Sequence, residues 1–99
     1  MTSSYQIVYW RDIPAQVRIR FGGERLARPL TERFQVAIDA AAMRVNATST
    51  DEYLEDWRTD DWQPGEGDPA ELADRLAAQI EADYPQGRLD ELVRLGGYE

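Results

Sequence analysis

The spacing of apolar residues changes from a strand pattern to a helix pattern at Thr31, and this change constrains the fold more than any other feature. Residues 15–21 alternate between apolar and polar side chains, which is typical of a half-buried strand. Residues 5–11 are rich in β-branched and aromatic residues and predict another strand, and the glycine pair in "FGGER" predicts a tight turn into a third strand over 25–30. The first third of the chain is therefore predicted to be a three-stranded antiparallel β-meander over about residues 5–30.

The rest of the chain is predicted to be mainly helical. An apolar stripe at helical spacing predicts a long helix over about residues 31–46, with Thr31 as its N-cap; the stripe consists of Phe34, Ile38, Ala41 and Val45. The acidic segments that follow are a short helix over about 50–58, the loop "TDDWQPGEGD", a helix over about 69–83 with Asp68 as its N-cap, and a short helix in "RLDELVRLGG". Three aromatic residues near the 50–58 helix are interpreted as core anchors rather than a ligand cage: Tyr53, Trp57 and Trp62.

Strands followed by helices, with no linker long enough to divide the chain, predict an α+β fold. A chain of 99 residues can bury one modest core, so we expect a single domain over residues 1–99. In this fold the 31–46 helix lies across one face of the meander, and the acidic C-terminal helices complete the core.

Charge is distributed unevenly along the chain. Residues 1–34 hold six arginines against three acidic residues, a net charge of +3, whereas residues 35–99 hold five against sixteen, a net charge of −11. The overall charge of −8 repels nucleic acid and anionic membranes at long range, so we expect neither as a partner. No stretch approaches the roughly 18 apolar residues of a membrane span, and we expect a cytoplasmic protein.

The residue types that are missing exclude several chemistries. The chain has no His, no Cys and no Lys. A structural zinc site, a thiol nucleophile, a His-based triad and a Schiff-base lysine are therefore excluded. The acidic stretch "DDWQPGEGD" lacks the spacing of a calcium loop. We therefore expect no cofactor, no metal site, no catalytic residues and no enzyme activity.

The hinge "WRDIP" connects the first two strands, and its length decides which side chains share a face. Asp12, Ile13 and Pro14 are interpreted as a turn with no further role. We favour a four-residue loop, because Pro14 then suits the second position of a type I turn. This register pairs Trp10 with Val17 and places Trp10 in the core.

The favoured register also predicts an outer face on which tyrosines alternate with arginines. The candidate interface on this face consists of Tyr5, Tyr9, Arg11, Arg18 and Arg20. Such a face could hold an anionic or aromatic partner through bidentate hydrogen bonds and stacking. Two alternatives stay open: the acidic helices of the same chain could cover this face, or a loop of odd length could move Tyr5 and Tyr9 to the core and leave Trp10 beside the arginines.

Three blocks of the sequence carry a family resemblance: "YQIVYWRDIPAQV", "RPLTERFQVAIDAAAMR" and "DEYLEDW". Together they resemble a small bacterial domain family described as "virulence factor", similar to conserved virulence factor C, over roughly residues 5–84. The resemblance assigns no catalytic or ligand-binding residues to positions of this chain. It implies an accessory role in one-carbon and corrinoid methyltransfer.

We therefore expect a small non-catalytic protein-interaction or accessory subunit of a bacterial cytoplasmic system. A protein partner is expected, and a homodimer is left open. The alternative is a small-molecule or anion-binding module that uses the Arg/Tyr face of the N-terminal hairpin.

Overall fold

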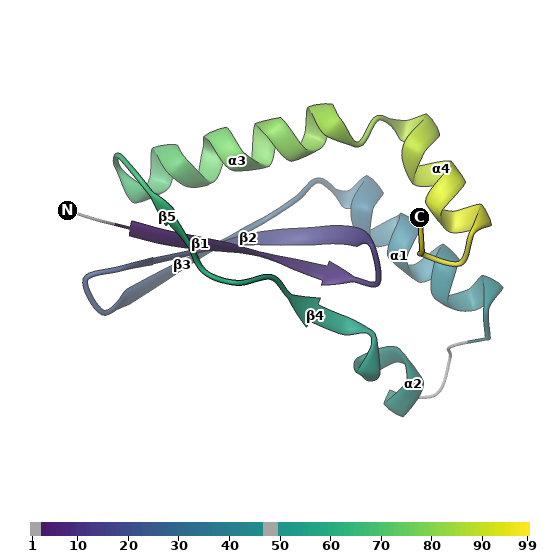
Figure 1. Cartoon of the computed structure of the whole chain (residues 1–99). Coiled ribbons are helices and arrows are strands. Elements are labelled where there is room, and N and C mark those ends of the chain that lie inside the picture. Colours follow the sequence, from purple (N-terminus) through teal and green to yellow (C-terminus); the bar gives the residue numbers. More distant parts are fainter. Residues whose placement is uncertain (1–2, 47–49) are drawn as a thin grey trace.

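The computed structural model describes residues 3–46 and 50–99, and it confirms the predicted α+β class (Figure 1). In chain order the elements are β1 (Ser3–Trp10), β2 (Ile13–Phe21), β3 (Glu24–Pro29), α1 (Glu32–Arg44), α2 (Thr50–Glu55), β4 (Trp57–Thr59), β5 (Gln63–Gly65), α3 (Pro69–Asp83) and α4 (Gln86–Arg94). The strands form one antiparallel sheet in the order β3-β2-β1-β4, and β5 also pairs with β1. The molecule is elongated and measures 44 × 28 × 19 Å along its principal axes.

The sheet is wider than the predicted meander. The segment 59–68, which was predicted to be a loop, contains β5 and the end of β4, and both strands pair with β1. The predicted 50–58 helix ends at Glu55, because the chain then pairs with β1 as β4. Asp60 completes the edge between the two short strands, since its Oδ1 accepts a 2.6 Å hydrogen bond from the N–H of Ile7. Backbone groups of β1 that a three-stranded meander would leave unpaired are satisfied in this way.

The loop between β1 and β2 has two residues, Arg11 and Asp12, so the predicted four-residue loop is wrong. Distant parts of the chain hold this turn. The N–H of Arg11 donates to the carbonyl of Asp56 at 2.9 Å, and the N–H of Asp12 donates to the carbonyl of Gly97 at 2.8 Å. Arg11 has a left-handed φ of 54°, which is costly for a residue with a side chain. Tertiary hydrogen bonds stabilise this conformation, and the local turn preferences used for the prediction do not include them.

The hairpin combines two registers. Tyr5 lies opposite Ile19, so both side chains face the same side, as in the alternative with an odd loop. A β-bulge between Val8 and Tyr9 then shifts the pairing by one residue. Trp10 is fully buried, which confirms its predicted place in the core, although a different register puts it there.

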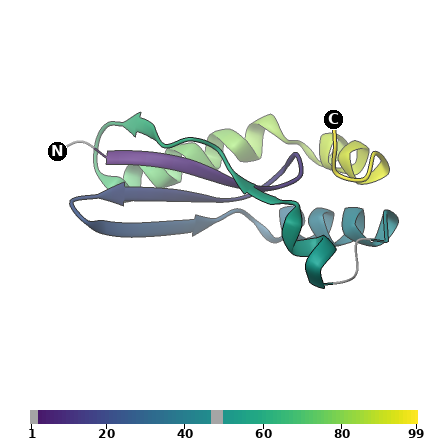
Figure 2. The same ribbon diagram turned by 60° about the horizontal axis from the view of Figure 1, so that its bottom comes forward.

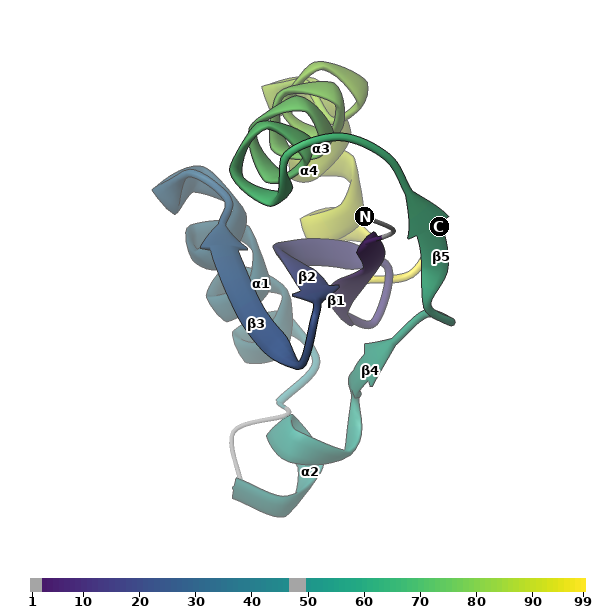
Figure 3. The same cartoon turned by 90° about the vertical axis from the view of Figure 1, so that its left-hand side faces the viewer.

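Helix α3 covers one face of the sheet (Figure 3). Ile7, Val17 and Ile19 point to this face, where they pack against Leu72 and Ala73 of α3 in one buried cluster. The helix therefore fixes which strand residues are hidden and which point the other way. This division defines the candidate site.

Helix α1 packs beyond the end of the sheet and beside α4, rather than across the sheet as expected (Figures 1 and 2). The connection from β3 to α1 consists of Leu30 and Thr31, and α1 is held at this end of the sheet by its packing against α4. A second buried cluster fills this end of the molecule, with Trp10, Ile13, Phe34, Ile38, Leu89 and Leu92 at its centre. Tyr53 and Trp57 pack against the same cluster, so their interpretation as core anchors is confirmed.

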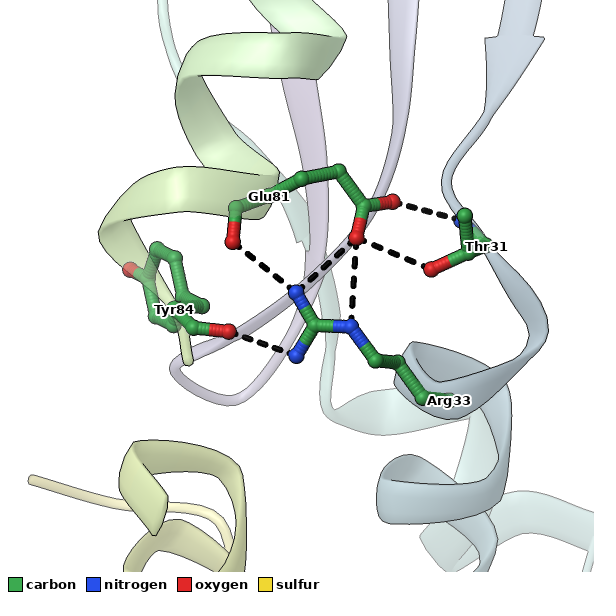
Figure 4. A network of polar contacts seen from close by, with 4 residues as sticks. All are labelled: Thr31, Arg33, Glu81 and Tyr84. Atoms are coloured by element: carbon green, nitrogen blue, oxygen red, sulfur yellow. Dashed lines mark hydrogen bonds and ion pairs between the residues drawn. The ribbon is translucent and has the colours of Figure 1, made fainter. Parts of the chain in front are cut away.

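A polar network joins the start of α1 to the end of α3 (Figure 4). Thr31 occupies the predicted N-cap position, but its hydroxyl donates to Glu81 at 2.9 Å instead of capping the helix. Arg33 donates to Glu81 and, at 2.6 Å, to the carbonyl of Tyr84. Burial alone would raise the pKa of the Glu81 carboxyl, but the hydrogen bonds from Thr31 and Arg33 outweigh it and lower that pKa.

Candidate functional site: the arginine face

The side chains that point away from α3 along β2 and β3 line hollows open to solvent. Arg18 lies opposite Ala27 and Arg20 lies opposite Arg25, and these residues alternate along β2 with the buried residues that contact α3. Residues on one face of a sheet recur every second position, so the three arginines share this face. We call Arg18, Arg20 and Arg25 the arginine face.

The arginine face differs from the other arginines of the chain in its contacts. Among the described residues, six arginines form ion pairs with carboxylates: Arg11 with Asp56, Arg28 with Asp74, Arg33 with Glu81, Arg58 with Asp12, Arg88 with Glu99 and Arg94 with Glu91. Arg44 and Arg75 donate to backbone carbonyls. Within residues 3–46 and 50–99, the side chain of Arg18 has only a long 3.5 Å hydrogen bond to the amide oxygen of Gln6, and the side chains of Arg20 and Arg25 form no hydrogen bond or ion pair. Among the described residues, the three arginines whose side chains contact neither a carboxylate nor a backbone carbonyl thus lie together.

The pairing of Arg20 with Arg25 is unfavourable for the isolated fold. The two residues are direct cross-strand partners, and both side chains are exposed. Like charges at directly opposite positions destabilise a sheet, by an amount of up to about 1 kcal/mol. The alternative in which the acidic helices of the same chain cover this face fails for these three residues, because α3 packs on the opposite face and its Asp74 pairs with Arg28. Their charge is therefore available to a partner.

Two hollows adjoin on this face, and Arg18 lines both. The larger has a volume of about 540 Å³ and is bounded by Gln16, Trp57 and Arg58 among others. The smaller, of about 320 Å³, is lined by Arg18, Arg25 and Trp62 with neighbouring residues of β2 and β3. The hollows together form a shallow groove along β2.

The groove is cationic and aromatic. The guanidinium of Arg20 stacks on the ring of Trp62 at 4.4 Å from its centroid, and Trp57 and Arg58 line the larger hollow. Stacking fixes the plane of a guanidinium and leaves its N–H edge free to donate. The chain has 19 acidic residues, yet none of the described residues that line either hollow is acidic. This combination suits an anion.

The structure separates the five residues predicted to share the interface. Arg18 and Arg20 lie on the arginine face, as expected. Tyr5 and Tyr9 pack against the cluster under α3, so their predicted place beside these arginines is wrong; the β1–β2 register is the reason. Burial raises the pKa of the Tyr9 hydroxyl, with smaller contributions from nearby charges.

Arg11 has a structural role in the turn between β1 and β2. Its guanidinium pairs with Asp56 at 3.0 Å, donates to the carbonyl of Gly96 at 2.7 Å and lies over the rings of Trp10 and Tyr98. These contacts tie the hairpin to the junction between α2 and β4 and to the C-terminal segment. The side chain is only 15% exposed, so little of it remains for a partner.

Two members of the site escaped the sequence analysis. Arg25 could have been found, because the glycine pair Gly22–Gly23 forms a two-residue turn that places Arg25 opposite Arg20. Trp62 was interpreted as a core anchor, but it is half-buried and lies under Arg20. No local pattern indicates this contact, because Trp62 lies between two strands that the sequence did not predict.

A hollow of about 530 Å³ lies between α1 and α4, lined by Val36, Ala40 and Val93 among others. No group of three or more His, Cys, Asp or Glu side chains among residues 3–46 and 50–99 is arranged to hold a metal ion. None of the helices in that part of the chain has the length and apolar character to cross a membrane.

Comparison with known proteins places the chain in a family. A family model described as "Virulence factor" matches residues 8–93, which is most of the chain. The chain therefore belongs to the virulence factor family, and the resemblance found in the sequence is confirmed. Neither the curated proteins nor the solved structures provide a match. The arginine face and Trp62 lie inside the matched range.

Proposed function

We propose that this protein is a non-catalytic interaction subunit whose arginine face binds an acidic segment of a partner protein. One observation carries the proposal: in a chain of net charge −8, the three described arginines whose side chains contact neither a carboxylate nor a backbone carbonyl lie together on one hollowed face of the sheet. A cross-strand pair of like charges destabilises the free protein, and a bound carboxylate would relieve that cost.

The shape of the groove supports a chain segment as the occupant. The stretch of β2 from Gln16 to Arg20 spans about 13 Å, enough for four or five residues of an extended peptide. The groove is shallow, whereas small-molecule sites enclose most of their ligand. Trp57 and Trp62 lie at its two ends and offer apolar contacts on either side of the charges.

The chemistry of the lining supports binding rather than catalysis. The groove presents guanidinium, amide and indole groups, which donate hydrogen bonds to anions. Arginine keeps its proton throughout the physiological range, so it does not exchange protons with a substrate there. Nucleic acid is disfavoured as the partner, because the net charge of −8 repels a long polyanion whose phosphates extend far beyond the groove, whereas a short acidic segment can keep most of its charge at the arginines.

The proposal is tested by fluorescence anisotropy with a labelled, glutamate-rich peptide of about ten residues, a length that exceeds the groove. The double variant Arg18→Gln/Arg20→Gln should bind the peptide at least about tenfold more weakly than the wild type, because it loses two charge-assisted hydrogen-bond donors. The control Arg44→Gln/Arg75→Gln makes the same change of net charge on exposed helix positions and should bind like the wild type. Equal losses in both variants, or no binding by the wild type, would count against the proposal.

A second candidate function is the binding of a small free anion. The 320 Å³ hollow favours it, because Arg18, Arg25 and Trp62 converge there on a volume that fits a small ligand. A small anion that binds as tightly as the peptide would favour this alternative. The link to one-carbon and corrinoid methyltransfer stays a prediction of the family resemblance, and the geometry of the face does not bear on it.

A further inference from the structure

We propose that the group recognised at the arginine face is a phosphate monoester carried by the partner segment, seated between Arg18 and Arg25. This inference rests on the proposed function and narrows its ligand from acidic segments in general to a phosphorylated one. It follows from the number of charges on the face, from the hollow they line and from the stacking of Arg20.

The charge on the face exceeds what a carboxylate can balance. Arg18, Arg20 and Arg25 contribute three positive charges within neighbouring sheet positions, and no described acidic residue pairs with them. A carboxylate supplies one negative charge and two oxygens. A phosphate monoester carries about −1.5 to −2 charges near neutral pH and three strongly accepting oxygens. The phosphate therefore matches the face better in charge and in the number of acceptors.

The hollow provides a place for such a group. Arg18 and Arg25 both line the 320 Å³ hollow beside Trp62, and Arg20 stands next to both, two residues from Arg18 on β2 and directly opposite Arg25. A guanidinium presents its donors as a planar fork that fits phosphate oxygens in pairs. Because Arg20 is stacked on Trp62, its fork is already oriented before a ligand binds.

Titratable groups of the protein do not interfere with this recognition at moderately acidic pH. The described residues that line the two hollows include no carboxylate and the chain has no histidine. Acidic residues that adjoin the groove are not part of its lining: Glu24 precedes Arg25 in β3, Asp61 precedes Trp62, Asp12 pairs with Arg58, and Asp60 accepts hydrogen bonds from β1. A change of pH between about 5 and 7.5 thus alters the charge of the phosphate, whose second pKa is near 6, while the face keeps its charge.

The experiment compares two peptides that differ at one position, a phosphoserine peptide and the same peptide with glutamate there, by fluorescence anisotropy with the whole protein. At about pH 7.5 the phosphopeptide should bind at least about tenfold more tightly, and this preference should fall several-fold at about pH 5, where most of the phosphate is a monoanion. Arg25→Gln should remove most of the preference, and Arg25→Lys should restore part of it because the charge returns without the fork. Arg75→Gln, on the surface of α3, should leave the preference unchanged.

Each other outcome overturns a distinct part of the account. If the two peptides bind with equal affinity and Arg18→Gln/Arg20→Gln abolishes the binding of both, the phosphate inference is wrong and the proposed function stands. If both peptides bind and neither Arg18→Gln/Arg20→Gln nor Arg25→Gln weakens their binding, the phosphate inference and the proposed function are both wrong. Inorganic phosphate should displace the phosphopeptide only at far higher concentration. If it binds as tightly as the phosphopeptide, the ligand is a free phosphate and the assignment to a partner segment is wrong.

Discussion

Replacement of Arg25 by glutamate should stabilise the folded protein while it destroys the arginine face. Arg25 lies directly opposite Arg20, and both side chains are exposed to water. Two like charges about 6 Å apart in water repel by about 0.7 kcal/mol, of which salt at about 0.1 M screens roughly half. Arg25→Glu removes this repulsion and adds an attraction of similar size. The free energy of unfolding should therefore rise by about 0.5–1 kcal/mol, at the upper end of measured cross-strand pairs.

Thermal unfolding followed by circular dichroism measures this effect. For a domain of this size the expected gain corresponds to a rise in Tm of about 2–8 °C at low salt. The gain should disappear in about 1 M salt, where charges more than about 3 Å apart are screened. Arg75→Glu makes the same charge change on α3, one helical turn after Glu71, and should lower the Tm because it adds a like-charge pair.

A Tm of Arg25→Glu below that of the wild type at low salt would refute the reasoning. It would show that the charge of Arg25 stabilises the folded chain, so that it would not be free for a partner. The expected combination is higher stability together with lost peptide binding. This combination is typical of residues that are kept for recognition at a cost to stability.

Three further predictions concern the fold. Trp10→Ala should cost about 3–5 kcal/mol in a urea melt, because it empties a fully buried site and leaves the carbonyl of Tyr53 without its 2.9 Å partner; a variant that melts like the wild type would contradict the buried position. Glu81 has a lowered pKa in the folded protein, so its contribution to stability is present above the unfolded pKa of about 4.3 and is lost as pH falls through the folded pKa. Glu81→Gln should therefore weaken the acid dependence of the Tm, and an unchanged dependence would argue against the network in Figure 4. Gly97→Ala should destabilise by about 1–3 kcal/mol in a urea melt, since Gly97 has a φ of +96° and an added Cβ would lie 3.0 Å from the Trp10 ring; wild-type stability would rule out this close contact.

The parts of the fold that were predicted correctly depend on local signals. Helix α3 begins at Pro69, and the carboxylate of Asp68 accepts hydrogen bonds from the N–H groups of Ala70 and Glu71, as its capping sequence indicates. The apolar stripe of α1 is buried at Phe34, as its period predicts. Such signals act within a few residues, so a single sequence contains them.

The parts that were missed depend on distant segments. Strands β4 and β5 have three residues each, too few for an alternating pattern, and they form because β1 offers an unpaired edge. The β1–β2 turn is held by Asp56 and Gly97, which lie far along the chain. Which helix covers the sheet likewise depends on contacts between distant segments. No local pattern specifies that this helix is α3 rather than α1.

The candidate site was predictable in part. The alternation of Arg18 and Arg20 with apolar residues placed them on one face, and the turn at Gly22–Gly23 would have added Arg25. Tyr5 and Tyr9 were placed on that face by a hairpin register that omitted the bulge. Whether an acidic helix covers the arginines is a question of tertiary packing, and only the structure shows that α3 lies on the other side.

The most direct test of the account is a titration of ¹⁵N-labelled protein with the acidic peptide, followed by NMR of the backbone amides and of the arginine Nε–Hε groups. The account predicts that the largest shift changes occur at Arg18, Arg20 and Arg25 and at the indole N–H of Trp62, with small changes at the hollow between α1 and α4. Changes centred on Val36 and Val93, or none at the three arginines while the peptide binds, would contradict the claim that the arginine face is the binding site.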